Sequence, residues 1–326
     1  MAQVVVFDEI GGPEVLKIRD RPVTEPAAHE VRIRVEAIGV NRADQMLRSG
    51  VYAFLPQLPG SRLGVEAAGV VDAVGADVTT LAVGEPVLVT AVPQMDADGV
   101  YGEYVNLPAD TVIHRPGDLG AVDAAALWVV YASAYGALVE KAGIRPGDHV
   151  LITAASSAVG MAAIQVANRI GAIPIATTRR AGKKAALLKA GARHVIVTEE
   201  RDVVQAAHDL TNGVGVDIIL DAIAGPGLPE LAKAAKFSGT IVVTGWLDTR
   251  PALLPMNWPL TIIGYSSYEH TLNKDGITRI AAFLDSGLRA GALSPTVSKV
   301  FALNEVVDAH RYLESGEQLG KVVITV

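Results

Sequence analysis

A basic run interrupts an otherwise acidic sequence. The chain contains 35 Asp and Glu residues against 28 Lys and Arg residues, yet the stretch between His149 and Glu199 has no acidic residue. Its basic residues are Arg169, Arg179, Arg180, Lys183, Lys184, Lys189 and Arg193. Such a cluster either forms a solvated helix face, as most charge runs do, or binds a ligand that carries phosphate.

The pattern around this cluster favours phosphate binding. Apolar strands are expected at 149–153 and 172–177, with a helix at 161–170 between them. The small residues 154–160 form the turn that joins the first strand to the helix. This strand–turn–helix–strand order is that of the phosphate-binding part of a dinucleotide fold.

The turn keeps only one glycine of the usual G-x-G-x-x-G pattern. That residue, Gly160, is expected to let the helix pack closely on the strand. Ser156 and Ser157 are expected to donate hydrogen bonds to a pyrophosphate. Ala158 and Val159, the next residues of the turn, are also expected to contact the cofactor, and the N-terminus of the helix beyond the turn attracts anions. The turn alone is a weak motif, and it gains weight from the basic residues that follow it.

The end of the second strand distinguishes the two nicotinamide cofactors. Sites for NAD usually have an acidic residue here, which binds the ribose 2′-hydroxyl. This chain has Thr178, Arg179 and Arg180 at that place, followed by Lys183. A guanidinium pairs with a 2′-phosphate through two parallel hydrogen bonds, whereas a carboxylate would repel it. The sequence therefore predicts NADP(H), with these four side chains around the 2′-phosphate.

Composition narrows the class of protein. The 326 residues are 50% hydrophobic and 19% charged, which is typical of an ordered globular enzyme with room for two domains. The chain has no cysteine, so disulfides, thiolate catalysis and cysteine-bound zinc are excluded. The uncharged stretches 124–139 and 150–168 are rich in small residues and predict buried core. We expect a cytoplasmic protein with neither nucleic acid nor membrane as a partner.

The elements that would position these residues change in character along the chain. Residues 1–120 are β-rich, with strands expected at 31–35, 67–74 and 87–91, and predict a partly open antiparallel barrel. Apolar strands and alanine-rich helices then alternate, which predicts a doubly wound parallel sheet. Its strands are expected at 149–153, 172–177, 194–197, 216–221, 239–243 and 261–264.

The C-terminal part is mixed again. Helices are expected at 277–288 and 306–313, and a final strand at 321–326 that returns to the first domain. The predicted domains are therefore residues 1–122 with 266–326, and residues 123–265. In such sheets ligands bind at the carboxyl ends of the strands, so Thr244, Gly245 and Trp246 should face the cofactor.

Several strings together resemble a known family. They are 39–44 (GVNRAD), 48–52 (RSGVY), 59–60 (PG), 64–69 (GVEAAG), 133–138 (SAYGAL) and 320–323 (GKVV). In these strings and in its domain order, the chain resembles the zinc-free quinone oxidoreductase branch of the medium-chain dehydrogenase/reductase superfamily. The resemblance covers essentially the whole chain. It implies a GroES-like β-rich catalytic domain and a Rossmann domain that binds NADP(H).

The resemblance also shows which zinc-binding features of the superfamily this chain lacks. Zinc-dependent members of the superfamily have metal ligands where this chain has Asn41, Val65 and Val129. They also have a proton-relaying hydroxyl where it has Ala43, and a four-cysteine lobe that is absent here. A zinc site needs three or four suitable ligands, so no metal is predicted. Without a Lewis acid, reduction of a conjugated acceptor by NADPH is favoured over alcohol oxidation.

The resemblance places further residues at the site. Asn41 should lie between nicotinamide and substrate and offer amide donors to a developing enolate, unless it is a simple turn asparagine. Tyr52 is expected to orient the substrate or donate a proton. Trp128 and Tyr131 should shape the acceptor pocket, with core packing as the alternative, and Trp246 should narrow it. The two remaining cofactor contacts are expected from Ser133 and Lys321.

Three functions remain open at this point. The first is an NADPH-dependent reductase of quinones or α,β-unsaturated carbonyls. The second is an enoyl-thioester reductase of the same fold, for which Arg42, Arg48 and Arg62 are the only candidate phosphate-binding residues in the first domain. The third is an NADPH-binding protein with little catalysis. The resemblance further implies a homodimer, with the sheets joined at strand 261–264.

Overall fold

The chain forms two compact units. The computed structural model describes residues 1–256 and 259–326. The first unit comprises Met1–Val129, Thr271–Asp285 and Pro295–Val326, and the second comprises Val130–His270 and Ser286–Ser294. The sequence-based boundaries at residues 122 and 265 are close to these limits, although 286–294 fall here in the second unit.

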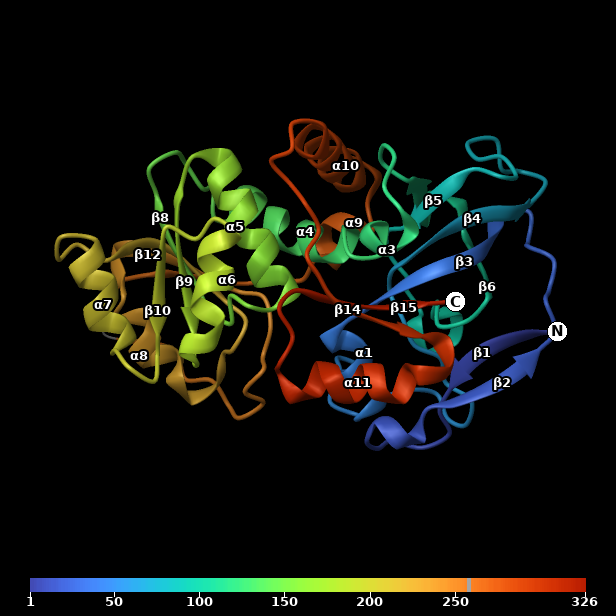
Figure 1. The fold of residues 1–326 in the computed structure, drawn as a ribbon, viewed down its shortest axis with the longest axis horizontal. Coiled ribbons are helices and arrows are strands. Elements are labelled where there is room, and N and C mark those ends of the chain that lie inside the picture. Colours follow the sequence, from blue (N-terminus) through green and yellow to red (C-terminus); the bar gives the residue numbers. More distant parts are fainter. Residues whose placement is uncertain (257–258) are drawn as a thin grey trace. The chain divides into compact units, whose positions relative to one another are not determined.

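The first unit is built on a seven-stranded sheet (Figure 1). Its strands follow the order β14-β15-β3-β4-β5-β7, and β6 pairs with β3. Their bounds are β3 Glu30–Val40, β4 Ala67–Val74, β5 Pro86–Val89, β6 Tyr104–Pro108, β7 Val112–His114, β14 Val297–Ala302 and β15 Lys321–Thr325. A two-stranded sheet of β1 (Ala2–Val6) and β2 (Lys17–Arg21) lies outside this order.

The central strand β3 explains why this sheet forms. Its apolar residues Val31, Ile33 and Val35 are buried, while Arg32 and Arg34 between them are more exposed. This alternation gives the strand one core face and one polar face. The last strand, β15, pairs antiparallel with β3 and parallel with β14, so the predicted return of the C-terminus is confirmed.

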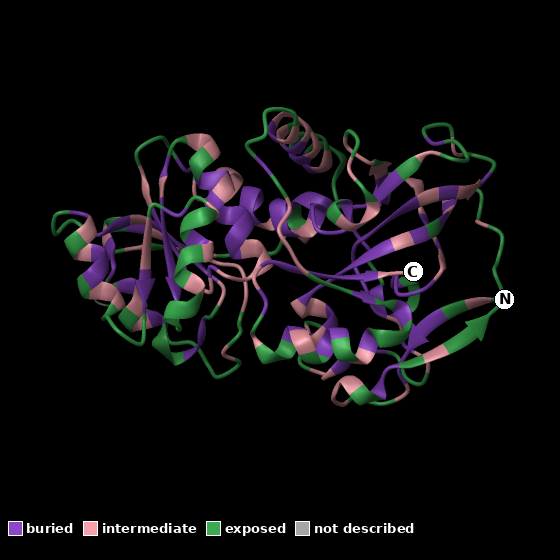
Figure 2. Ribbon diagram, viewed as in Figure 1, coloured by how far each residue is buried: buried purple, intermediate pink, exposed green. Residues whose placement is uncertain are grey.

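Helices complete the first unit. They are α1 Arg42–Arg48, α2 Met95–Asp98, α3 Ala121–Ala124 and α11 Val306–Ser315. The helix α10 (Lys274–Arg289) contributes residues to both units. The core contains the inward side chains of β3, β4, β5 and β15 together with residues of α11 such as Leu313. Figure 2 shows these strands as mostly buried.

The second unit contains a six-stranded parallel sheet in the order β10-β9-β8-β11-β12-β13. The strands are β8 His149–Ile152, β9 Ile173–Thr178, β10 His194–Val197, β11 Val216–Asp221, β12 Ala235–Val243 and β13 Thr261–Gly264. All six predicted strands are thus present. The chain starts in the middle at β8, runs outward to β10 and then continues on the other side from β11. This is the doubly wound order that forms a ligand-binding crevice at the reversal point.

The helices of this unit are short, with one exception. They are α4 Trp128–Tyr135, whose first two residues belong to the first unit, α5 Ala158–Ile170, α6 Lys184–Lys189, α7 Val203–Leu210, α8 Leu228–Ala232 and α9 Tyr268–Thr271. α5 packs against β8 and β9. One helical stretch, Ala121–Lys141, is long and apolar enough to cross a membrane, but 72% of its apolar window is buried inside the protein. The burial identifies it as a core segment.

Candidate cofactor and acceptor sites

The turn after β8 leads directly into the N-terminus of α5. Ser157 is the N-cap of α5, and its Oγ accepts a hydrogen bond from the backbone N–H of Gly160 at 3.1 Å. Ala154 has a left-handed backbone, with φ of 45°. A Cβ at Gly160 would lie 2.6 Å from backbone atoms of Ala155, so only glycine allows this approach of helix and turn. The predicted role of this glycine in packing therefore agrees with the structure.

One basic side chain contacts this turn. Lys183, from the segment after β9, donates from Nζ to Ser156 Oγ at 3.2 Å, which joins two predicted cofactor residues far apart in sequence. Arg179 and Arg180 are exposed. Thr178 is buried and its hydroxyl donates to the carbonyl of Arg180 at 3.4 Å. No acidic residue lies in the first turn of α5, so its N-terminus and these cations present positive charge together. The residues present fit the phosphates of NADP(H).

A buried aspartate orders the neighbouring loops, and the sequence reasoning gave it no role beyond ending a strand. Asp221 closes β11 and is fully buried. Its Oδ1 accepts from Thr153 Oγ1 at 2.7 Å and from the N–H of Ile223 at 3.1 Å, and its Oδ2 accepts from the N–H of Ala224 at 2.8 Å. A carboxylate that accepts several hydrogen bonds is a satisfied buried charge. Asp221 thus fixes the carboxyl ends of β8 and β11, where a Rossmann ligand binds.

The loop after β12 packs on the Asp221 loop. The N–H of Thr244 donates to the carbonyl of Asp221 at 2.7 Å, and the N–H of Leu247 donates to the carbonyl of Ala222 at 3.2 Å. Gly245 lies against Ala222, where a Cβ would come within 3.2 Å of the carbonyl oxygen. Trp246 is 44% exposed. Thr244, Gly245 and Trp246 therefore stand at the carboxyl end of the sheet, as predicted, and their contacts with a cofactor stay a prediction.

In the first unit, Asn41 sits at the centre of a buried polar cluster. It directly precedes α1, and its backbone N–H donates to Asp44 Oδ2 at 2.8 Å. Its side-chain Nδ2 donates to the carbonyl of Gly39 at 2.9 Å and to Glu66 Oε1 at 3.0 Å. Both amide hydrogens are therefore engaged within the protein, whereas the sequence-based expectation assigned them to a developing enolate.

Lys321 binds the oxygen of the Asn41 carboxamide. Its Nζ donates to Asn41 Oδ1 at 2.6 Å and forms an ion pair with Glu66 Oε1. Lys321 is 2% exposed, so it is a buried cation and not a surface lysine. Glu66 was part of a recognised string but was given no role, and nothing in the local sequence reveals its partner, which lies 255 positions away.

Asp44 extends the cluster into the core. It is fully buried, and its Oδ2 also accepts from the Tyr101 hydroxyl at 3.0 Å. Burial raises the pKa of Asp44 to about 7, and Lys321 opposes part of that rise. Burial also raises the pKa of Tyr101 well above its ordinary value. Sequence reasoning missed both residues, because neither one stands in a pattern that distinguishes a core polar group from a surface one.

The aromatic residues predicted to shape the acceptor pocket have different surroundings. Trp128 and Tyr131 are each 1% exposed. The Tyr131 hydroxyl donates to Gln165 Oε1 at 2.8 Å, and burial raises its pKa. These facts favour the core-packing alternative for this pair. Tyr52 is partly buried against the core and meets Phe54 edge to face, with ring centroids 5.2 Å apart. Ser133 is half-buried. The substrate roles of Tyr52 and Ser133 stay predictions.

Within residues 1–256 and 259–326, no group of three or more His, Cys, Asp or Glu side chains could hold a metal ion. The three positions compared with zinc ligands also have other structural roles. Asn41 belongs to the cluster above, Val65 is buried in the core, and the backbone N–H of Val129 donates to Glu66 Oε2 at 2.9 Å.

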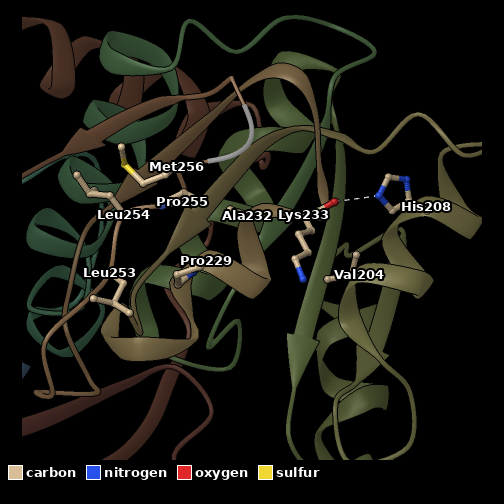
Figure 3. Close-up of a pocket in the computed structure, with 9 residues that line it drawn as sticks. All are labelled: Val204, His208, Pro229, Ala232, Lys233, Leu253, Leu254, Pro255 and Met256. Atoms are coloured by element: carbon tan, nitrogen blue, oxygen red, sulfur yellow. Dashed lines mark hydrogen bonds between the residues drawn. The ribbon is translucent and has the colours of Figure 1, made fainter.

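A separate apolar pocket of about 660 Å³ lies in the second unit (Figure 3). It is lined by residues of α7, of α8 and of the segment before β13: Val204, His208, Pro229, Ala232, Lys233, Leu253, Leu254, Pro255 and Met256. None of the predicted site residues is among them. His208 Nε2 lies 2.9 Å from the carbonyl of Lys233, so this imidazole is held by the backbone.

Comparisons with known proteins agree on one family. The model for the alcohol dehydrogenase GroES-like domain matches residues 27–117, and the model for zinc-binding dehydrogenase matches residues 158–279. Quinone oxidoreductase of Homo sapiens is 32% identical to this chain, over 99% of this chain and 97% of the human one. The crystal structure of Escherichia coli quinone oxidoreductase complexed with NADPH is similar over 100% of both chains, with a TM-score of 0.92 and 28% identity. The CurK enoyl reductase covers 99% of both chains, with a TM-score of 0.87 and 26% identity.

Proposed function

This chain belongs to the zinc-free quinone oxidoreductases of the medium-chain dehydrogenase/reductase superfamily, and we propose that it transfers a hydride from NADPH to a quinone or a similar conjugated carbonyl. NADPH supplies the hydride, and one proton completes the reduced acceptor. The choice of cofactor rests on a basic rim beside the N-terminus of α5, formed by Arg179, Arg180 and Lys183. Lys183 donates a hydrogen bond to Ser156, and the first turn of α5 has no acidic residue.

The cofactor-binding roles follow from this rim. Ser157 and the first N–H groups of α5 hold the pyrophosphate, because the helix N-terminus is the positive end of its dipole. Arg179 and Arg180 bind the 2′-phosphate as exposed guanidinium groups, with Lys183 beside them. Thr244 and Gly245 support the nicotinamide end from the loop after β12. Each of these assignments is a proposal that binding measurements on single variants test.

Hydride transfer leaves negative charge on the acceptor, and this charge spreads over a conjugated π-system. Asn41 and Tyr52 are the polar residues that we propose for the acceptor site. The Asn41 amide oxygen accepts a hydrogen bond from Lys321, whose ammonium group supplies positive charge beside it. A protein group that stabilises this charge replaces part of the help that a metal would give.

The enoyl-thioester alternative is less favoured by the structure. It needs free basic residues for the phosphates of a carrier group. Arg48 is buried, with its guanidinium bound to Gly11 and Glu314, and Arg42 donates to the carbonyl of Leu313 at 3.3 Å. Arg62 has Nε and Nη2 without a hydrogen-bond partner among the described residues, but both atoms are buried. One arginine is a poor match for several phosphates, so quinone reduction is the better proposal.

We also propose a cytoplasmic homodimer. The outer strand β13 pairs only with β12 within the described sheet, which leaves one edge of the strand open. Leu253 and Leu254 are each 64% exposed and Met256 is 84% exposed. A second copy of the chain that adds its β13 to this edge would cover such residues. Light scattering of the purified protein gives the oligomeric state, and a monomer at micromolar concentration would contradict the proposal.

The first experiment compares NADPH with NADH as the reductant of 1,4-benzoquinone, 9,10-phenanthrenequinone and a simple enone, followed by nicotinamide absorbance. In Arg180→Glu, the preference for NADPH should fall by about 10- to 100-fold, the value of a lost charge-assisted hydrogen-bond pair. Lys189→Glu is the matched control, because Lys189 is exposed in the same unit and lies outside the proposed site. Equal use of both cofactors by the unmodified protein would refute the phosphate site, and lack of turnover despite NADPH binding would refute the reductase.

A further inference from the structure

The ion pair between Lys321 and Glu66 is buried where three neighbouring strands meet. Lys321 opens β15, Glu66 immediately precedes β4, and Gly39 lies near the end of β3 between them. A Cβ at Gly39 would lie 2.6 Å from Glu66 Oε1 and 2.7 Å from Lys321 Cε. The absence of a side chain at this position therefore leaves the room that the pair occupies.

The pair fixes the orientation of the Asn41 carboxamide. The oxygen of the amide faces the ammonium of Lys321, and its nitrogen faces the Glu66 carboxylate and the Gly39 carbonyl. A flipped amide would place its NH₂ against an ammonium and its oxygen against a carboxylate and a carbonyl. Each of these contacts is repulsive, so charge alone selects one orientation.

The pair is anchored and costly, which argues for a role beyond stability. The second oxygen of Glu66 accepts from the N–H of Val129 at 2.9 Å, so the carboxylate cannot turn away from Asn41 without losing a hydrogen bond. Burying two charges costs desolvation energy that their attraction often only balances. A hydrophobic pair of similar volume would fill the same space, yet it would leave the Asn41 amide with its hydrogen bond to the Gly39 carbonyl and without the charges that select its orientation.

We infer that Lys321 and Glu66 are positioning residues for Asn41. Glu66 accepts from the amide nitrogen together with the Gly39 carbonyl, so the amide oxygen, with the Lys321 cation beside it, is the atom that Asn41 presents to the ligand. Asn41 then acts toward the ligand as a hydrogen-bond acceptor, and Lys321 stabilises the negative charge that develops on the acceptor. This inference rests on the proposed quinone reduction for its catalytic consequence and on the cluster geometry for the fixed amide.

The catalytic test measures kcat and KM for the quinone, together with the Kd for NADPH, in Lys321→Met and Lys321→Arg. We expect kcat to fall by about 10- to 100-fold in Lys321→Met, the effect of one charge-assisted contact, while the Kd for NADPH changes by less than about twofold. Lys321→Arg keeps the charge and should recover most of kcat. Lys299→Met is the matched control, because Lys299 is an exposed lysine on the adjacent strand β14. Unchanged kcat in Lys321→Met would overturn the catalytic part of the inference.

A second measurement does not depend on activity. In protein labelled with ¹⁵N-asparagine, the side-chain amide of Asn41, assigned with Asn41→Ser, should exchange slowly with solvent and should exchange faster in Lys321→Met. If Lys321→Met does not fold, the double variant Lys321→Met/Glu66→Leu removes both charges together and should restore folding with the same fast exchange. Slow exchange that survives loss of the pair would overturn the positioning role. A chain that reduces no quinone but shows the protected amide would refute the proposed function and leave the positioning intact.

Discussion

The carboxyl group of Asp44 makes protein stability depend on pH in a direction that can be predicted. This residue is fully buried, and its Oδ2 accepts hydrogen bonds from the N–H of Asn41 and from the Tyr101 hydroxyl. Its Oδ1 has no hydrogen-bond partner in the described part of the chain. Asp44→Asn imitates the neutral acid, because an asparagine oxygen in place of Oδ2 keeps both hydrogen bonds.

The size of this pH effect on the free energy of unfolding follows from the raised pKa of Asp44. Burial raises the pKa of Asp44 from 3.8 to about 7, so between these values the folded protein binds a proton that the unfolded chain releases. The stabilising contribution of Asp44 is thus complete below pH 3.8 and is lost as the pH rises through about 7. At about 1.4 kcal/mol per pKa unit, the loss reaches about 4 kcal/mol.

A second buried group acts in the opposite direction in the same pH range. His310 has its pKa lowered from 6.5 to about 3, first by burial and then by the positive charges of Arg48 and Arg42. Its contribution to stability is present above 6.5 and is lost as the pH falls toward about 3. The two slopes partly cancel in the unmodified protein, so Asp44 must be measured as a difference between two proteins.

The assay is urea unfolding of the unmodified protein and of Asp44→Asn, followed by circular dichroism at about pH 4, 5, 6, 7 and 8. The stability of the variant relative to the unmodified protein should increase with pH by up to about 4 kcal/mol over this range, with equal m-values. Asp209→Asn, at an exposed carboxylate, should give a nearly constant difference. If the Asp44→Asn curve stays parallel to that of the unmodified protein, Asp44 does not titrate in this window and the reasoning is wrong.

Three further predictions concern other parts of the two units. Gly160→Ala should weaken NADPH binding and lower the melting temperature, because its Cβ would lie 2.6 Å from the backbone of Ala155; Gly182→Ala, with open space around its Cβ, should do neither. His310→Phe should raise the unfolding free energy by about 1–3 kcal/mol. Both ring nitrogens of His310 lack a hydrogen-bond partner among the described residues, and a phenylalanine keeps the ring contact with Tyr101. A loss of stability in urea unfolding would contradict this and would indicate a water that bridges the imidazole. Incubation with EDTA should leave quinone reduction unchanged in steady-state assays, and activity that returns only with added metal would contradict a zinc-free mechanism.

Local sequence patterns were sufficient to predict the second unit. Strands such as β8 and β11 are short apolar runs bounded by turn residues, and parallel strands buried on both faces have that signature. The start of α5 was predicted three residues late, at 161 instead of 158. Ser157, which caps the helix, was assigned to the turn, and the alanine and valine that follow it give no cap signal. The turn, the helix and the cations that we propose for phosphate binding lie within one continuous stretch, so their proximity was predictable for the same reason.

Local sequence patterns do not predict the contacts of the polar cluster in the first unit. Asn41 and Asp44 are close in sequence, but Glu66 and Lys321 reach them only through the pairing of β3, β4 and β15, and Tyr101 comes from the segment between α2 and β6. The sequence reasoning expected Lys321 to contact the cofactor and not to pair with a buried carboxylate, because charged side chains are seldom fully buried. Only the strand register reveals that Lys321 and Glu66 face each other.

This difference also explains why the expected role of Asn41 changes once its neighbours are known. A lone asparagine before a helix offers two donors and one acceptor, so the sequence reasonably assigned its donors to an enolate. The Gly39 carbonyl and the Glu66 carboxylate accept from those donors, and Lys321 places a cation beside the oxygen. The chemistry of a residue is thus set by which of its atoms remain unpaired after folding, and in this protein the strand pairing that buries Lys321 decides it.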